Sequence, residues 1–119
     1  MEEYKDRFLA ETYSDDQPVC FGIKKRGKDV EWLAEMPESL FDRCQSIARA
    51  YSLHLLPSIN YYQPTRLSKA QCSTLVEEVE FIESVVKDSL LEKYLPEFKA
   101  AILRCVRLPF DVEAVIEGP

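Results

Sequence analysis

The spacing of the apolar residues changes twice along this chain, and no other feature constrains its fold as strongly. Apolar and polar side chains alternate over residues 19–34, helical spacing follows over residues 40–51, 72–86 and 91–105, and alternation returns over residues 110–116. Alternation is typical of strands with one buried face, and a spacing of three and four is typical of amphipathic helices. The chain is therefore predicted to form an α+β fold. In this fold a small antiparallel sheet, made of N-terminal strands and a C-terminal strand, packs against two to three helices.

A β-hairpin is predicted at the start of this pattern. Two alternating runs flank residues 25–29, and their apolar members are Val19, Phe21, Ile23, Val30, Trp32 and Ala34. Alternation on both sides of a glycine-containing turn is typical of a hairpin. The basic side chains of residues 24–28 are expected to be solvated, with a small anion contact as the alternative. Further upstream, residues 8–13 fit a strand and a helix about equally, so both alternatives stay open.

The first predicted helix begins at Pro37 and Glu38, because proline suits the first helical turn and glutamate suits the positive end of the helix dipole. Its apolar stripe consists of Leu40, Cys44, Ile47, Ala48 and Tyr51. The next apolar segment, residues 53–59, contains Pro57, which lacks the N–H group that a sheet ladder uses. This segment is therefore predicted to be extended or to form an edge strand.

A capping box predicts the start of the second helix. Ser68 and Gln71 are spaced so that each side chain reaches the backbone N–H group of the other residue. The stripe that follows consists of Cys72, Leu75, Val76, Val79, Ile82 and Val86. A further helical pattern over residues 91–105 contains Pro96, and an interior proline removes a backbone hydrogen bond. We expect a short helix to about Tyr94, followed by a kink or by a restart with Pro96 as the first residue.

Length and charge narrow the class of protein. The chain has 119 residues, which suits a single domain over residues 1–119. It carries 21 acidic and 15 basic residues, for a net charge of −6. Nucleic-acid binding draws on clustered Lys and Arg side chains, so no nucleic-acid partner is expected. No apolar run approaches the roughly 20 residues of a membrane span, and residues 1–8 are too charged for a signal peptide. We therefore expect a cytoplasmic protein with no membrane partner.

Residue types that carry catalysis or bind metals are sparse and scattered. The cysteines, Cys20, Cys44, Cys72 and Cys105, do not form the close pairs typical of zinc sites, and His54 is the single histidine. The chain has three glycines, too few and too dispersed for a phosphate-binding loop or a nucleophile turn. We expect structural cysteines, no metal, no cofactor and no enzymatic activity. A hydrolase or transferase that uses His54 with a cysteine, serine or carboxylate is the enzymatic alternative.

The candidate functional residues lie in the second helix and in the loop before it. Glu77, Glu80 and Asp88 fall opposite the apolar stripe, and Phe81 lies beside them. Phe81 is either a core residue of a doubly covered helix or an exposed aromatic ring among carboxylates, which suits a protein-binding patch. The loop over residues 60–65 carries adjacent tyrosines, which serve either contact or core packing. The candidate partner-binding residues are Tyr61, Tyr62, Glu77, Glu80, Phe81 and Asp88.

One stretch of the chain resembles a known kind of protein. Its pattern consists of Ile59, Tyr62, Thr65, Leu67, Ser68, Gln71, Leu75, Glu78 and Val79. The pattern resembles one in small, largely uncharacterised bacterial proteins, some of which look like immunity proteins of toxin systems. The likeness covers residues 56–80, with a looser likeness at the Val-Ile-Glu ending. The sequence departs from it at Pro64, where a turn-forming Asp or Gly is expected.

The resemblance implies a non-enzymatic inhibitor with a protein partner. It carries over no active-site residue to this chain. On this hypothesis an acidic face with aromatic anchors covers the basic cleft of a cognate toxin domain. The alternative is a homo-oligomeric structural or accessory protein, whose self-interface would include Phe81, Val85 and Leu90.

Overall fold

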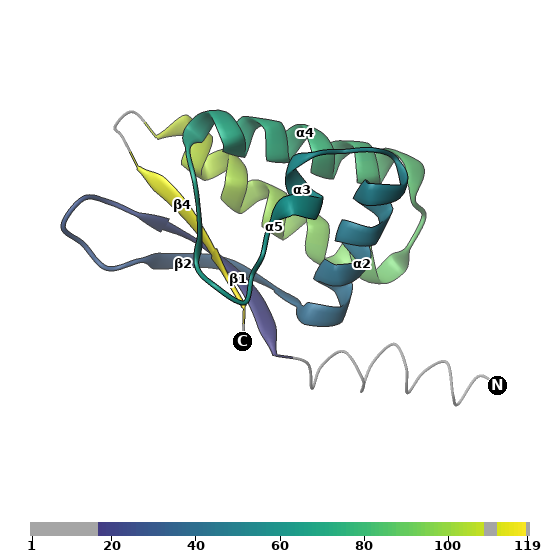
Figure 1. Cartoon of the computed structure of the whole chain (residues 1–119), viewed down its shortest axis with the longest axis horizontal. Coiled ribbons are helices and arrows are strands. Elements are labelled where there is room, and N and C mark those ends of the chain that lie inside the picture. Colours follow the sequence, from purple (N-terminus) through teal and green to yellow (C-terminus); the bar gives the residue numbers. More distant parts are fainter. Residues whose placement is uncertain (1–16, 109–111, 119) are drawn as a thin grey trace.

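A computed structural model of the chain describes residues 17–108 and 112–118. The described elements run along the chain in the order β1 (Pro18–Lys24), β2 (Glu31–Pro37), α2 (Glu38–Ala50), α3 (Leu55–Ser58), β3 (Thr65–Leu67), α4 (Lys69–Val85), α5 (Ser89–Arg107) and β4 (Glu113–Glu117) (Figure 1). Strands, a run of helices and a returning strand confirm the predicted α+β fold. Residues 8–13 lie outside the described part of the chain.

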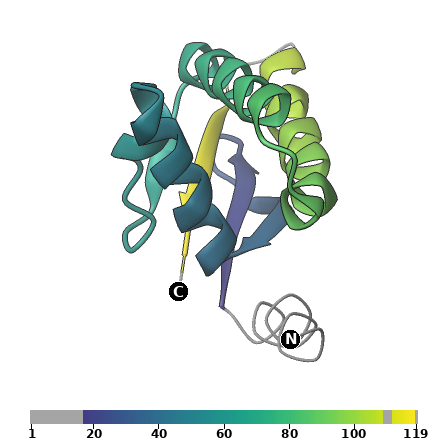
Figure 2. The same cartoon turned by 90° about the vertical axis from the view of Figure 1, so that its right-hand side faces the viewer.

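The four strands form one antiparallel sheet in the order β2-β1-β4-β3. The long helices α2, α4 and α5 lie together on one face of this sheet (Figures 1 and 2). The buried strand residues Val19, Phe21 and Ile116 belong to the same hydrophobic cluster as the helix residues Phe41 and Phe98. Among the described elements, no helix covers the other face of the sheet. The fold therefore has two layers, with its core between sheet and helices.

The predicted hairpin is confirmed, but a bulge changes which face one of its side chains occupies. Strict alternation would place Trp32 and Ala34 on the same face. The register shifts between Phe21 and Gly22, so that Ala34 pairs with Phe21 while Trp32 pairs with Gly22. Leu33 is the extra residue of this bulge. As a result Ala34 lies on the helix-covered face and Trp32, which is 46% exposed, lies on the open face.

The predicted starts of α2 and α4 are confirmed. Helix α2 begins at Glu38, directly after Pro37. At α4 the capping box is complete: the Gln71 backbone N–H donates to Ser68 Oγ at 3.2 Å, and the Ser68 N–H donates to Gln71 Oε1 at 2.9 Å. The expectation that Tyr51 is buried in the stripe of α2 is wrong, because the helix ends at Ala50 and Tyr51 is half exposed beyond it.

The prediction of an extended segment over residues 53–59 is wrong. Leu55–Ser58 form the single helical turn α3. The buried carboxylate of Glu78 accepts the backbone N–H groups of Leu55 at 3.0 Å and Leu56 at 2.8 Å. From the other side, the Gln45 amide donates to the carbonyls of Leu56 and Ile59. Two buried polar side chains therefore hold a turn that local sequence does not predict.

The expected helix end near Tyr94 and restart at Pro96 are also wrong, because α5 runs without interruption from Ser89 to Arg107. An interior proline costs a helix about 3 kcal/mol. The apolar side chains of α5 are buried on both sides of the proline, at Leu91, Leu95, Phe98, Ala101, Ile102 and Cys105. Burial of one such side chain contributes roughly 1.5–3 kcal/mol, so packing along the whole helix outweighs the lost hydrogen bond.

The predicted C-terminal strand is confirmed as β4, which pairs with β1 as expected. It also pairs with β3, a three-residue strand within the segment that the sequence predicts as loop and helix start. None of the described helices is long and apolar enough to cross a membrane.

Candidate functional site

An aromatic pair on the helical side of the molecule is the first candidate. Phe81 lies on the face of α4 opposite its buried stripe, and its ring is 37% exposed. The Tyr51 ring, which follows the end of α2 and is 50% exposed, meets it nearly edge-on. The ring centroids are 5.2 Å apart and the interplanar angle is 72°. Val85, one turn beyond Phe81, is also exposed. We call these three residues the Tyr51–Phe81 patch.

Two carboxylates lie on the same side of α4 as Phe81. Glu77 is one turn before it and Glu80 is its neighbour, and both side chains are exposed. Within residues 17–108 and 112–118, neither makes a hydrogen bond or an ion pair, and Glu80 has only a longer-range electrostatic interaction with the Lys99 ammonium. Phe81 is therefore an exposed ring beside unpaired acidic groups, the arrangement that suits a protein contact.

Asp88 has a different environment from the other acidic candidates. Its carboxylate caps α5 by accepting the N–H groups of Leu90 at 2.9 Å and Leu91 at 3.3 Å. It also forms an ion pair with Arg43 of α2 at 2.6 Å, and its side chain is only 11% exposed. Asp88 thus ties α2 to the start of α5, and its charge is already compensated.

The two adjacent tyrosines have opposite environments. Tyr61 is buried, and its hydroxyl donates to Asp42 Oδ1. Burial and this hydrogen bond raise the pKa of Tyr61 well above its ordinary value. Tyr62 is 64% exposed, and its hydroxyl donates to Glu38 Oε1 at 2.9 Å. The Tyr62 ring is therefore largely exposed, whereas Tyr61 holds the loop against α2.

Helix α2 separates the two groups of aromatic candidates. Tyr62 bonds to Glu38, the first residue of α2, whereas Phe81 packs on Tyr51, which directly follows the last one. The 13 residues of α2 correspond to about 20 Å at 1.5 Å per residue. Phe81, Glu77 and Glu80 therefore lie close together at one end of α2, and Tyr62 lies at the other end of this helix.

The thiols and the histidine do not converge. His54 is exposed just before α3, and the Sγ atoms of Cys72 and Cys105 are 4.0 Å apart in the core. Burial raises the pKa of the Cys44 and Cys72 thiols to about 12, so both stay protonated at neutral pH. Within the described ranges, no group of three His, Cys, Asp or Glu side chains is placed to hold a metal ion.

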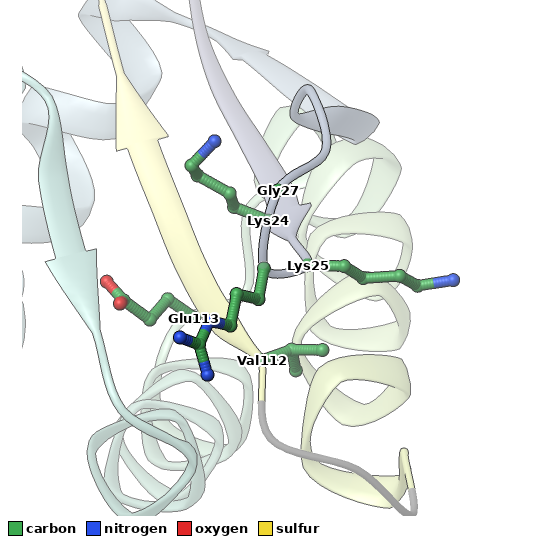
Figure 3. Close-up of a pocket in the computed structure, with 6 residues that line it drawn as sticks. Lys24, Lys25, Gly27, Val112 and Glu113 are labelled. Atoms are coloured by element: carbon green, nitrogen blue, oxygen red, sulfur yellow. The ribbon is translucent and has the colours of Figure 1, made fainter.

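The basic turn borders a hollow of about 430 Å³ that is lined by Lys24, Lys25, Arg26, Gly27, Val112 and Glu113. Figure 3 shows that the Lys24 and Lys25 side chains point to opposite sides. The Lys24 ammonium donates to the Lys28 carbonyl at 2.8 Å. These charges do not gather around one point, so this hollow lacks the convergent donors of an anion site.

Two features of the surface are not predicted by the sequence. Tyr51 has the spacing of a core residue, but α2 ends one residue before it and the ring is therefore exposed. Trp32 has the alternation of a core strand residue, and only the bulge at Leu33 turns it to the open face. Comparison with protein-family models, with curated proteins and with solved structures finds no match for this chain.

Proposed function

We propose that this chain is a non-enzymatic protein-binding domain whose partner docks on the Tyr51–Phe81 patch. The observation that carries this proposal is the pair of partly exposed rings in edge-to-face contact. Aromatic side chains contribute much of the binding energy in protein interfaces. Rings that already hold each other in place lose less side-chain freedom when a partner binds.

The charges around the patch favour a basic partner. Glu77 and Glu80 are exposed and unpaired beside Phe81, and the chain carries a net charge of −6. Complementary charges at the rim of an interface orient a partner and speed its association. Asp88 and Tyr61 contribute indirectly, because they position α5 and the 60–65 loop and offer no free group to the partner.

More specifically, we propose an immunity protein that neutralises a bacterial toxin by covering a basic cleft. The resemblance over residues 56–80 and the acidic, aromatic surface support this proposal. An interface of standard size buries about 800 Å² on each partner, which corresponds to a patch roughly 30 Å across. Such a footprint extends from Phe81 along α2, about 20 Å long, to Tyr62.

Affinity capture of the tagged chain from the lysate of its native cells tests this function. We expect one basic protein at equal stoichiometry, with less recovered as the salt concentration rises. Phe81→Ala is expected to reduce recovery more than tenfold. Glu77→Gln with Glu80→Gln is expected to weaken the salt dependence, and Glu92→Gln with Glu97→Gln, an equal charge change on exposed α5 surface, is the matched control.

Exposure of Phe81 and Val85 also favours one other function, a self-assembling structural or accessory protein. Light scattering of the purified chain distinguishes the two. A monomer agrees with the inhibitor, whereas a stable oligomer that Phe81→Ala dissociates would replace the proposed function with self-assembly.

A further inference from the structure

Strand β2 forms one edge of the sheet, a surface that the function proposed above does not use. β2 is an end strand, and among the described residues it pairs only with β1. The outward N–H and C=O groups of an edge strand are a template for another strand. Figure 1 shows β2 at the margin of the sheet, with α5 above it. One side of β2 is thus available for pairing beside a helix.

A groove follows this edge. It has a volume of about 520 Å³, and its lining includes Trp32, Leu33, Ala34 and Glu35 of β2 with Glu97 and Ala100 of α5. This volume falls within the roughly 300–1,000 Å³ of typical ligand pockets. A groove between an edge strand and a helix is the geometry in which peptides bind by strand addition.

The two sides of the groove differ in chemistry. On the open face of the sheet, Trp32 and Glu35 offer an aromatic surface and a carboxylate, a combination that suits a Lys or Arg side chain. On the helical side, Ala34 of β2 and Ala100 of α5 line the groove next to Glu97, and their small apolar side chains leave room for an apolar side chain. Successive residues of a strand point to opposite faces, so the matching peptide alternates basic and apolar residues.

Charge decides between a foreign peptide and a second copy of this chain. Glu35 and Glu97 are both exposed, and neither has a hydrogen bond or ion pair within the described residues. Two copies paired along β2 would bring two chains of net charge −6, each with these two carboxylates, to one shared edge. Like charges brought together at an interface disfavour association. The carboxylates therefore favour a basic peptide over a second copy of this chain.

We propose that the β2–α5 groove binds an extended peptide segment of a partner, with alternating basic and apolar residues, as a fifth strand of the sheet. The basic residue lies over Trp32 and pairs with Glu35, and the apolar residue enters between Ala34 and Ala100. This inference goes beyond the function proposed above and uses a different surface.

Trp32 is the single tryptophan of the chain, so its fluorescence reports directly on this groove. The probe is a short synthetic peptide that alternates arginine and valine, titrated into the purified full chain. We expect a saturable change in emission and no change with a glutamate–valine peptide. Glu35→Gln combined with Glu97→Gln is expected to weaken binding at least tenfold, and Glu77→Gln combined with Glu92→Gln, an equal charge change outside the groove, is the matched control.

A second pair of peptides tests strand addition itself. A strand bonds to its neighbour through alternate amides, so N-methylation of one set of alternate amides should abolish binding while the other set is tolerated. No saturable change, or equal binding of both methylated peptides, would overturn the proposal. If the chain without peptide instead gave the mass of a dimer and the same change in Trp32 emission as its concentration rose, the edge would be assigned to a second copy.

Discussion

The Tyr51 ring meets the Phe81 ring nearly edge-on, with the ring centroids 5.2 Å apart and both rings partly open to solvent. Tyr51 directly follows the end of α2 and Phe81 lies near the C-terminal end of α4, so their contact also fixes how the two helices meet at this surface. A double-mutant cycle with Tyr51→Ala, Phe81→Ala and the double variant measures the contact. We expect a coupling of about 0.5–1.5 kcal/mol in urea unfolding. Additive effects of the two substitutions would show that the pair is not preformed.

The buried Glu78 carboxylate is expected to be a large local contributor to stability. It accepts two backbone N–H groups, of Leu55 and Leu56, and its side chain is 7% exposed. Glu78→Ala leaves both buried donors without a partner, which should lower the free energy of unfolding by about 2–4 kcal/mol. Its exposed neighbour offers the control: Glu77→Ala should change stability by no more than about 0.5 kcal/mol. Equal effects of the two substitutions would refute the capping role.

Gly22 leaves the space in which the Trp32 ring lies. A Cβ atom at position 22 would be 2.7 Å from Trp32 Cε3 and 2.9 Å from the Glu31 backbone oxygen. Gly22→Ala should therefore destabilise the chain by about 1–3 kcal/mol and change the Trp32 emission spectrum. Gly27→Ala, where φ is 75° but the surroundings are open, should destabilise without changing the spectrum. An unchanged spectrum in Gly22→Ala would mean that the ring does not lie on Gly22.

Alkaline pH is expected to weaken the fold partly through Cys44. Burial raises the pKa of its thiol from 9.0 to about 12. Above pH 9.0 the unfolded chain releases this proton while the folded chain keeps it, so the free energy of unfolding falls as pH rises through this window. One such group contributes at most about 1.4 kcal/mol per pH unit. Urea unfolding at about pH 8 and pH 10 should show a smaller decline for Cys44→Ala than for the natural chain. Identical declines would contradict this assignment.

The order of the elements follows from local patterns in the sequence, whereas the surfaces do not. Alternation around Phe21 and the capping box at Ser68 predict β1 and α4 because they depend on neighbours along the chain. The turn α3 depends on Glu78 and the continuity of α5 through Pro96 depends on packing. Both causes lie in contacts between distant segments.

The same distinction applies to the candidate site. Helical spacing correctly separates Phe81, Glu77 and Glu80 from the buried stripe of α4. It does not reveal that Tyr51, which follows α2, contacts Phe81, or that Asp88 is neutralised by Arg43. Tyr61 and Tyr62 are adjacent in sequence and differ in exposure because the Tyr61 ring packs against Phe41 and its hydroxyl donates to Asp42, contacts with another segment of the chain.

Hydrogen exchange of the chain, alone and with its captured partner, tests the proposed binding surface most directly. We predict that protection on binding concentrates on residues 77–85 of α4 and on the end of α2 beside Tyr51. Glu77→Gln and Phe81→Ala should lose this protection together with affinity. Protection confined to the open face of the sheet, with residues 77–85 unchanged, would contradict docking on the Tyr51–Phe81 patch.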